Sequence, residues 1–224
     1  MPSNVGFVIR TRNEEQHVGF ALQSVFNFFG DDAQVVVVDN SSSDETLQVV
    51  ALFPKRFHPN LSIISIQRDH YTPGLSLNTG VSHITSPIVG VLSAHCEIME
   101  LQESQLLLHF KDANCVGVFG RQVPIYKGKK IKPRYVWSNF IAPHIVTNPV
   151  EDTGFDVRPF FHNAFSFIRT SFARFDQDLS GKEDRYWARD MISMGHTLKF
   201  DPALVCRHYW TSRGATWRDD EDLL

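Results

Sequence analysis

The sequence has few cysteines, no long apolar run and little net charge. Its cysteines, Cys96, Cys115 and Cys206, are widely spaced and form no C-x-x-C pair, which argues against a disulfide framework or a structural zinc site and favours a reducing cytoplasm. No stretch is apolar for long enough to predict a membrane span, and the first residues lack the basic and apolar regions of a signal peptide. A formal net charge of −3 argues against a nucleic-acid partner bound by overall basicity.

What the sequence does contain is ample material for a core. The chain has 224 residues, of which 42% are hydrophobic, enough for one large α/β domain or two small ones. It shows no internal repeat and no low-complexity segment. The acidic end of the chain, DDEDLL, is expected to be frayed.

The most informative stretch is VVVVDNSSSDET, residues 35–46. Four β-branched residues without polar alternation predict a strand covered on both faces, as in a parallel α/β sheet. Asp39 ends this strand, and ligands of open α/β sheets bind just beyond the carboxyl ends of strands. The three following serines also allow Asp39 to act only in forming a turn, and Asp44 can cap a helix over residues 45–53.

Apolar patterns along the rest of the chain predict an α/β order of elements. Strands are expected at residues 5–11, 61–67, 88–92, 115–121, 197–201 and 204–208, with a half-buried alternating strand at 163–169. Helices are expected from residue 13 or 14 to Gly30 and over residues 75–83, 105–111 and 182–194. Residues 122–159 show no sustained period, and a loop of this length is usually functional or mobile. If the strands are parallel, the segment after residue 92 reaches the same sheet edge as Asp39.

Four segments carry a resemblance to a known family. They are VIRTRNEEQHVGFALQSV, VVVVDNSSSDET, PGLSLNTGVSHITSPIVGVL and FDQDLSGKEDRYWARDMISMGHTLKFDP. In order and spacing they resemble family 2 glycosyltransferases with the A-type fold. The resemblance implies an α/β single domain over residues 1–224, with a mostly parallel central sheet flanked by helices. It divides the chain into a nucleotide-sugar-binding half, 1–121, and an acceptor-binding and catalytic-base half, 122–224.

The activity implied is inverting transfer of a sugar from a nucleotide-activated donor to an acceptor hydroxyl, in polysaccharide or glycolipid assembly. Carried over by position, the resemblance implies donor contacts from Thr11, Arg12, Asn13, Glu14, Asp39, Arg68, Gly74, Asn78, Ser93, Ala94 and His95. Asp39 would recognise the base, because a buried carboxylate accepts from an imide N–H and leaves a mismatched base unpaired. Arg68 would either reach the donor phosphates or remain solvated in its loop.

The metal signature of the family is absent. The family carries Asp-x-Asp after its fourth strand, whereas this chain has Ser93-Ala94-His95, so the use of a divalent cation, Mn²⁺ or Mg²⁺, is in question. Three outcomes stay open: His95 is a metal ligand, it donates a hydrogen bond to phosphate, or the site works without metal. His208 matches a family histidine that approaches the metal or diphosphate, so His95 and His208 are the predicted metal residues.

The expected base lies at the start of the last predicted helix. Glu183-Asp184 resembles the family's Glu-Asp pair, whose Asp takes the acceptor proton. Ser180 and Glu183 also form an S-x-x-E capping box, which would give Glu183 a structural task and leave Asp184 as the base. Asp184 could instead be only a first-turn carboxylate favoured by the helix dipole. Trp187 is expected to form an apolar wall, packing in the core with Met191 and Met194.

The irregular middle is expected to bind the acceptor, a glycan or lipid-linked molecule. Tyr135 and Trp137, with Phe140, offer flat apolar faces, and His162 and Asn163 offer polar contacts. The basic run KGKKIKPR either attracts an anionic acceptor or the inner face of the membrane, or is a solvated hairpin tip.

Two other functions remain open. A degenerate relative that binds nucleotide or glycan without catalysis would explain the missing Asp-x-Asp. A nucleotidyltransferase is disfavoured, because no Gly-rich phosphate loop follows the first strand.

Overall fold

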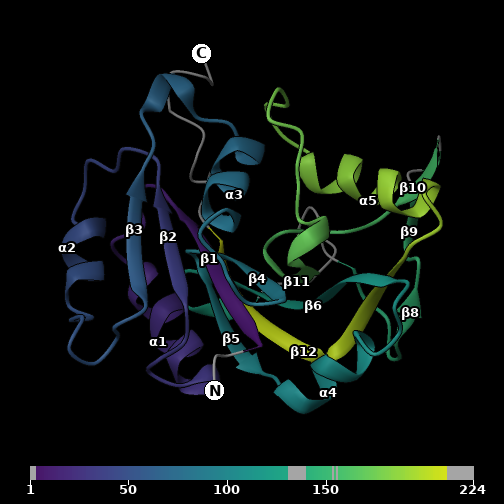
Figure 1. Ribbon diagram of the computed structural model, residues 1–224, viewed down its shortest axis with the longest axis horizontal. Helices are drawn as coiled ribbons and strands as arrows, with labels where there is room; N and C mark the ends of the chain where they lie inside the picture. The colour runs from purple at the N-terminus through teal and green to yellow at the C-terminus, as the bar shows by residue number, and fades with distance from the viewer. Residues whose placement is uncertain (1–3, 131–139, 153, 155, 211–224) are drawn as a thin grey trace.

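The computed structural model describes residues 4–130, 140–152, 154 and 156–210, which form a large sheet flanked by helices (Figure 1). The order of the main strands is β3-β2-β1-β4-β11-β6-β12-β5, with β7 beside β6 and β8 beside β12, and β9 and β10 form a separate pair. The strands are β1 (Val5–Thr11), β2 (Val35–Asp39), β3 (Leu61–Ser65), β4 (Ile88–Ser93), β5 (Cys96–Glu100), β6 (Cys115–Tyr126), β7 (Lys129–Lys130), β8 (Val146–Thr147), β9 (Val150–Asp152), β10 (Val157–Pro159), β11 (Phe165–Arg169) and β12 (Thr197–Trp210). The helices are α1 (Val18–Phe29), α2 (Thr46–Ala51), α3 (Pro73–Val81), α4 (Glu103–His109) and α5 (Glu183–Ser193), with 3₁₀ turns η1 (Arg68–His70) and η3 (Thr170–Phe172).

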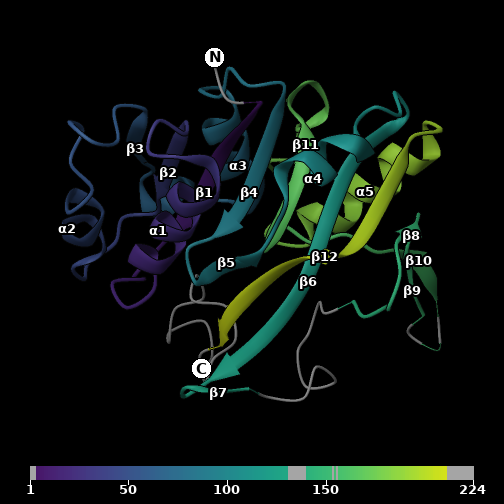
Figure 2. The same cartoon turned by 90° about the horizontal axis from the view of Figure 1, so that it is seen from below.

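The predicted mostly parallel sheet is confirmed. Strands β3, β2, β1 and β4 pair in parallel, and β6 pairs in parallel with β12. Only β11 and β5 of the main path run the other way, each pairing antiparallel with its neighbours. The single sheet passes through both halves of the chain (Figure 2).

Helices cover both faces of the sheet, and strand β2 shows why the valine run is unbroken. Val35 and Val37 pack in one apolar cluster with residues of α1, α2 and α4. Val36 and Val38 pack in the other cluster with residues of α3 and α5. Each side chain of β2 is therefore buried, as the absence of alternation predicts.

The register of the parallel strands brings the predicted donor residues to one edge. Thr11 at the end of β1 stands beside Asp39 at the end of β2. On its other side β1 places Arg10 beside Ser93 at the end of β4. The predicted meeting of the Asp39 and Ser93 corners at the carboxyl edge is confirmed.

Four element predictions differ from the structure. Helix α1 begins at Val18, because residues 14–17 form a turn in which the Glu14 carbonyl accepts from the amides of His17 and Val18. The two strands expected at 197–208 are one strand, β12, with a register shift between Asp201 and Val205. Strand β5 was not predicted, and the described part of the expected loop at 122–159 contains the end of β6 and the short strands β7 to β10.

Burial also corrects two expectations. Strand β11 is buried on both faces, because it lies between β4 and β6 in the centre of the sheet. Trp187 is 3% exposed and Met191 packs against the core, but Met194 is 67% exposed at the end of α5. Helical spacing therefore predicted two of the three buried positions.

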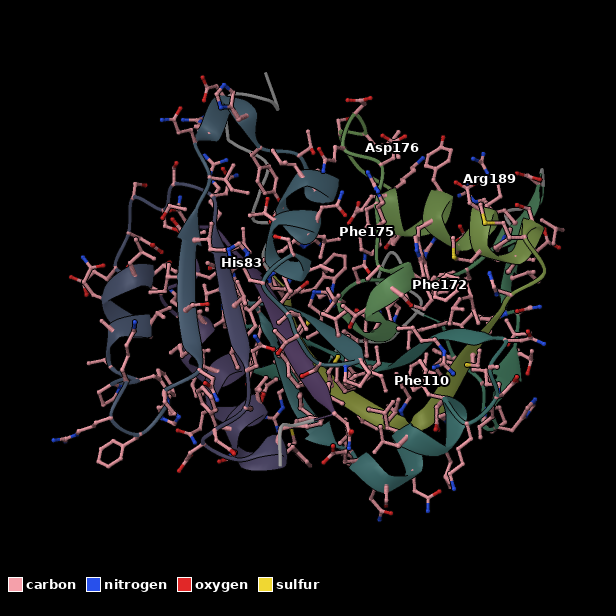
Figure 3. The ribbon with its side chains drawn as sticks, in the orientation of Figure 1. His83, Phe110, Phe172, Phe175, Asp176 and Arg189 are labelled. Carbon is pink, nitrogen blue, oxygen red and sulfur yellow. The ribbon has the colours of Figure 1, made fainter. Side chains whose placement is uncertain are left out.

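Helix α3 is tied to the segment that leads into α5 (Figure 3). The side-chain Nδ2 of Asn78 donates to the Phe175 carbonyl at 2.8 Å, and its Oδ1 accepts from the Phe175 backbone amide at 2.9 Å. A Cβ atom added at Gly74 would lie 1.9 Å from the Asp176 carbonyl oxygen. Glycine is thus required where α3 meets the chain before the last helix.

We expect Gly74→Ala to destabilise the fold by about 1–3 kcal/mol, because the new methyl group meets backbone that must move. Gly181→Ala is the matched control, since nothing lies within 4 Å of its added Cβ atom. Urea unfolding monitored by tryptophan fluorescence measures both. Equal stability of the two variants would contradict the close approach.

Candidate active site

A small hollow lies where β1 and β4 end. Its volume is about 40 Å³, and it is lined by Arg10, Thr11, Arg12, Glu14, Tyr71, Ser93 and His95. Five of these seven residues are predicted donor contacts. Ala94, between the last two, is fully buried, and its amide donates to the Arg10 carbonyl. The sequence therefore identified most of the lining of this hollow, but neither Arg10 nor Tyr71.

The loops after β1 and β2 are joined by side-chain hydrogen bonds. The backbone amide of Asn13 donates to Ser42 Oγ at 2.9 Å, and Asn13 Oδ1 accepts from the backbone amide of Ser43 at 2.8 Å. Asp39 is 1% exposed, and its two carboxylate oxygens accept from the amide and hydroxyl of Ser42. These contacts show Asp39 in the turn-forming role, because they tie its carboxylate to the turn that follows β2. Recognition of a base by Asp39 stays a prediction.

A buried carboxylate lies behind the predicted metal histidines. Glu14 is 2% exposed; its Oε1 lies 2.7 Å from His95 Nδ1 and its Oε2 lies 3.3 Å from His17 Nδ1. The ring of His208 stacks on that of His95, with centroids 4.9 Å apart. The resemblance implies a nucleotide contact for Glu14, which stays a prediction, and in the structure its carboxylate lies against two imidazoles.

His208 has a polar partner of its own. Its Nδ1 is hydrogen-bonded to Gln122 Oε1 of strand β6. Burial, and then the nearby imidazoles of His95 and His162, hold the pKa of His208 well below its usual value. The stacking places His95 and His208 side by side, and their convergence on a phosphate or metal stays a prediction.

Helix α5 is anchored to β1 by an ion pair. Arg10 Nη1 lies 3.0 Å from Glu183 Oε1, and the side chains are 17% and 7% exposed. The predicted capping box is wrong: the residue before α5 is Lys182 with φ of 63°, and no side chain caps the helix. Glu183 does have a structural task, but its partner is Arg10, 173 residues earlier in the chain.

Asp184 has the electrostatics of a base that works near neutral pH. Loss of hydration, and then repulsion by Glu183, raise the pKa of Asp184 to about 6, against opposing effects of Arg185 and Arg10. Arg185 is itself held by Glu151 at 3.2 Å and lies over the Phe160 ring. Trp187 is buried, with its Nε1 donating to the Phe172 carbonyl at 2.8 Å, and its role as an apolar wall beside Asp184 stays a prediction.

The predicted acceptor residues are only partly described. Tyr135 and Trp137 lie outside the described residues. His162 and Asn163 are each 2% exposed, so neither offers its side chain at the surface. His162 Nε2 is bonded to the Gly120 carbonyl, and burial followed by Arg185 lowers the pKa of His162 to about 3.

Other predictions for the middle of the chain are resolved in part. Phe140 was expected to face a sugar, but it packs against Phe119, Phe160 and Phe200. Lys127, Lys129 and Lys130 are all exposed at the β6–β7 hairpin, as a solvated tip requires. Lys132 and Arg134 lie outside the described residues.

The remaining donor predictions are placed as follows. Arg68 is exposed in η1, on the loop that leads to α3. Gly74 and Asn78 lie against the Phe175–Asp176 segment, and a donor role for them stays a prediction. Among the described residues no helix is long and apolar enough to cross a bilayer.

Sequence reasoning missed Arg10, Tyr71, Gln122 and Arg185. Arg10 had a signal, because a cation inside an otherwise apolar strand must find a buried partner. Gln122 follows a run of buried β6 residues and is 2% exposed. Nothing in the local sequence indicates Tyr71 or Arg185.

Comparisons with known proteins agree with this arrangement. A family model described as "Glycosyl transferase family 2" matches residues 7–174. The succinoglycan biosynthesis protein ExoO of Rhizobium meliloti (strain 1021) is 22% identical over 212 residues, which cover 89% of this chain and 59% of that protein. The chain thus spans about three fifths of this relative.

Solved glycosyltransferase structures share the fold. GalNAc-T7 with UDP, GalNAc and Mn²⁺ superimposes with a TM-score of 0.69 at 14% identity, covering 93% of this chain and 44% of that one. S. aureus TarS 1–349 with UDP-GlcNAc gives 0.67 at 17%, covering 97% and 60%. Mannosyltransferase PcManGT from Pyrobaculum calidifontis with GDP-Man and Mn²⁺ gives 0.65 at 21%, covering 96% and 59%.

We expect Arg10→Gln to lower the free energy of unfolding by about 3–5 kcal/mol, because it leaves Glu183 buried without a cation beside Asp184. The double variant Arg10→Gln with Glu183→Gln should recover much of the loss, since no buried charge remains unpaired. Arg189→Gln is the control: its ion pair with Asp190 is exposed, so the change should be within about 1 kcal/mol. Urea titration at pH 7.5 distinguishes these outcomes. Equal effects of Arg10→Gln and Arg189→Gln would refute the anchoring role.

Proposed function

Because the chain belongs to glycosyltransferase family 2, we propose that it moves a sugar, with inversion, from a nucleotide-activated donor to an acceptor hydroxyl. The acceptor is a glycan or lipid-linked molecule in polysaccharide or glycolipid assembly. The succinoglycan biosynthesis relative supports the pathway class. The neighbours bound to UDP-GlcNAc and GDP-Man support a nucleotide-sugar donor.

One observation carries the proposal. Arg10 lines the hollow at the donor edge and also binds Glu183, the neighbour of Asp184. The donor edge and the candidate base therefore meet at a single side chain, although Arg10 and Asp184 lie far apart in the sequence. A carboxylate with a pKa near 6 beside a phosphate-sized hollow with two arginines suits displacement at an activated sugar.

The reaction follows from these positions as a single displacement. The acceptor hydroxyl gives its proton to Asp184 while its oxygen forms a bond to the anomeric carbon. The bond from that carbon to the diphosphate oxygen breaks, and the electron pair leaves with the nucleoside diphosphate. Arg12 and Arg10 stabilise the departing negative charge. Attack from the side opposite the leaving group inverts the anomeric configuration.

A divalent cation fits the residues at the donor edge. His95 and His208 present imidazole nitrogens beside Glu14, and these two imidazoles would hold it. A bound cation supplies Lewis-acid stabilisation of the diphosphate. The Mn²⁺ in two of the neighbouring structures supports this part of the proposal.

The acceptor chain would extend from Asp184 along α5. A hollow of about 340 Å³ lies between η3 and that helix, and Phe172, Asp176 and Arg189 are among its labelled residues (Figure 3). Tyr186 and Met194 add exposed apolar surface. Aromatic faces flanked by carboxylate and guanidinium groups suit sugar rings. The exposed lysines near the β6–β7 hairpin would favour an anionic membrane surface.

We expect Asp184→Asn to reduce transfer by about 10²–10⁴-fold while leaving donor affinity close to that of the wild type, because the amide cannot accept the acceptor proton. In the wild-type protein the rate should fall as pH drops through about 6, where the carboxylate of Asp184 becomes protonated. A panel of UDP- and GDP-sugars, with product detection and separate nucleotide-binding measurements, provides the assay. Asp178→Asn is the control, because Asp178 is an exposed carboxylate that lines neither the donor nor the acceptor hollow.

The panel also tests the alternative of a binding protein without catalysis. Nucleotide binding without transfer or donor hydrolysis for any sugar or cation would support that alternative and reject the enzyme. An Asp184→Asn variant with normal turnover would reject the base. Pyrophosphate release from a nucleoside triphosphate would instead indicate a nucleotidyltransferase.

A further inference from the structure

The two histidines at the donor edge share an arrangement that the sequence did not indicate. His95 Nδ1 faces a carboxylate oxygen of Glu14 at 2.7 Å. His208 Nδ1 faces the amide oxygen of Gln122. Both oxygens come from side chains that are 2% exposed and that belong to other elements, the turn before α1 and strand β6.

This arrangement decides which ring nitrogens carry protons. A carboxylate oxygen and an amide oxygen only accept hydrogen bonds, so each Nδ1 must donate. In a neutral imidazole the other nitrogen, Nε2, then keeps its lone pair. A lone pair cannot donate to a phosphate oxygen, but it can bind a cation. Of the outcomes left open by the sequence, the contacts favour metal ligation over a hydrogen bond from His95 to phosphate.

We propose that Glu14 and Gln122 are positioning residues, which hold His95 and His208 with both Nε2 lone pairs available to one transition-metal dication. The site consequently takes Mn²⁺, Co²⁺ or Zn²⁺ in preference to Mg²⁺, because Mg²⁺ prefers hard oxygen ligands and imidazole suits transition metals. The assignment deepens the proposed function and rests on it only for the role of the cation at the donor diphosphate.

The position of Glu14 fits this task in three respects. Its backbone amide donates to Thr46 Oγ1 at 2.7 Å, which fixes the turn. Its second oxygen lies near His17, whose ring stacks on Tyr209. Its carboxylate places a negative charge directly behind His95, where the Asp-x-Asp carboxylates are lacking. Carboxylates behind ligating histidines commonly fix the ring and strengthen it as a ligand.

Cys96 lies close to the two histidines. Ligand atoms of His95, Cys96 and His208 are all within 4.8 Å of one another. Cys96, however, is 1% exposed and belongs to the apolar cluster on one face of the sheet, together with Cys206. We therefore assign it to the wall of the site, and the experiment below tests this directly.

The test is metal binding by the purified protein without donor. Mn²⁺ is titrated by electron paramagnetic resonance of the free ion, Mg²⁺ by competition against Mn²⁺, and Co²⁺ by its absorption spectrum. We expect Mn²⁺ and Co²⁺ to bind at least 10-fold more tightly than Mg²⁺. Glu14→Gln and Gln122→Met should each weaken Mn²⁺ binding by about 10- to 100-fold. His95→Asp should shift the preference toward Mg²⁺, because it restores an oxygen ligand.

Glu97→Gln is the matched control. Glu97 is a neighbouring carboxylate that binds Arg207 and Tyr209, so its loss should leave Mn²⁺ affinity unchanged. Cys96→Ala should also retain the affinity and the Co²⁺ spectrum. Circular dichroism and thermal unfolding show whether each variant is folded. If a variant does not fold, His95→Asp, which keeps a metal ligand at that position, is measured in its place.

Two results would overturn the inference: Mg²⁺ binding as tight as that of Mn²⁺, or unchanged Mn²⁺ affinity in folded Glu14→Gln. A thiolate-to-cobalt absorption band lost in Cys96→Ala would also reject the assigned ligand set. These outcomes are independent of the donor assay. Selective metal binding without turnover of any donor would reject the proposed function alone, whereas turnover without metal selectivity would reject only the present assignment.

Discussion

The ion pair between Arg10 and Glu183 is the contact on which the candidate site depends. It joins the first strand to the last helix across 173 residues, in a place where neither charge is well hydrated. A buried ion pair adds little to stability compared with apolar side chains, but it is demanding in geometry. Here the ion pair fixes positions. Because Arg10 lies at the donor edge, its contact with Glu183 holds the start of α5, and therefore Asp184, near that edge.

The same contact influences the chemistry of the base. Glu183 and loss of hydration raise the pKa of Asp184, while Arg10 and Arg185 oppose the rise. The balance keeps Asp184 ionised at neutral pH, yet more basic than a surface aspartate. At the donor edge a second buried carboxylate, Glu14, is bonded to His95. Charge in this site is thus carried largely by buried side chains rather than by carboxylates facing the donor.

Much of the fold followed from the sequence, and the reasons are local. The valine run of β2 predicted burial on both faces, and parallel strands then required Asp39 and Ser93 to share an edge. What could not be predicted depends on partners distant in the chain. The local S-x-x-E pattern favoured a capping box, but Arg10 competed for Glu183. Glu14 matched a nucleotide contact by position, and only the pairing of β5 with β12 brings His208 beside His95, the histidine that Glu14 contacts.

The most direct test of the account is a crystal structure with a nucleoside diphosphate sugar and Mn²⁺. We expect the diphosphate at the hollow lined by Arg12, Ser93 and His95, with the metal at His95 and His208 and the sugar's anomeric carbon facing the Asp184 side. A nucleotide bound away from the ends of β1 and β4, or a sugar that Asp184 cannot approach through an acceptor, would contradict the central claim that the two ends of the chain form one site.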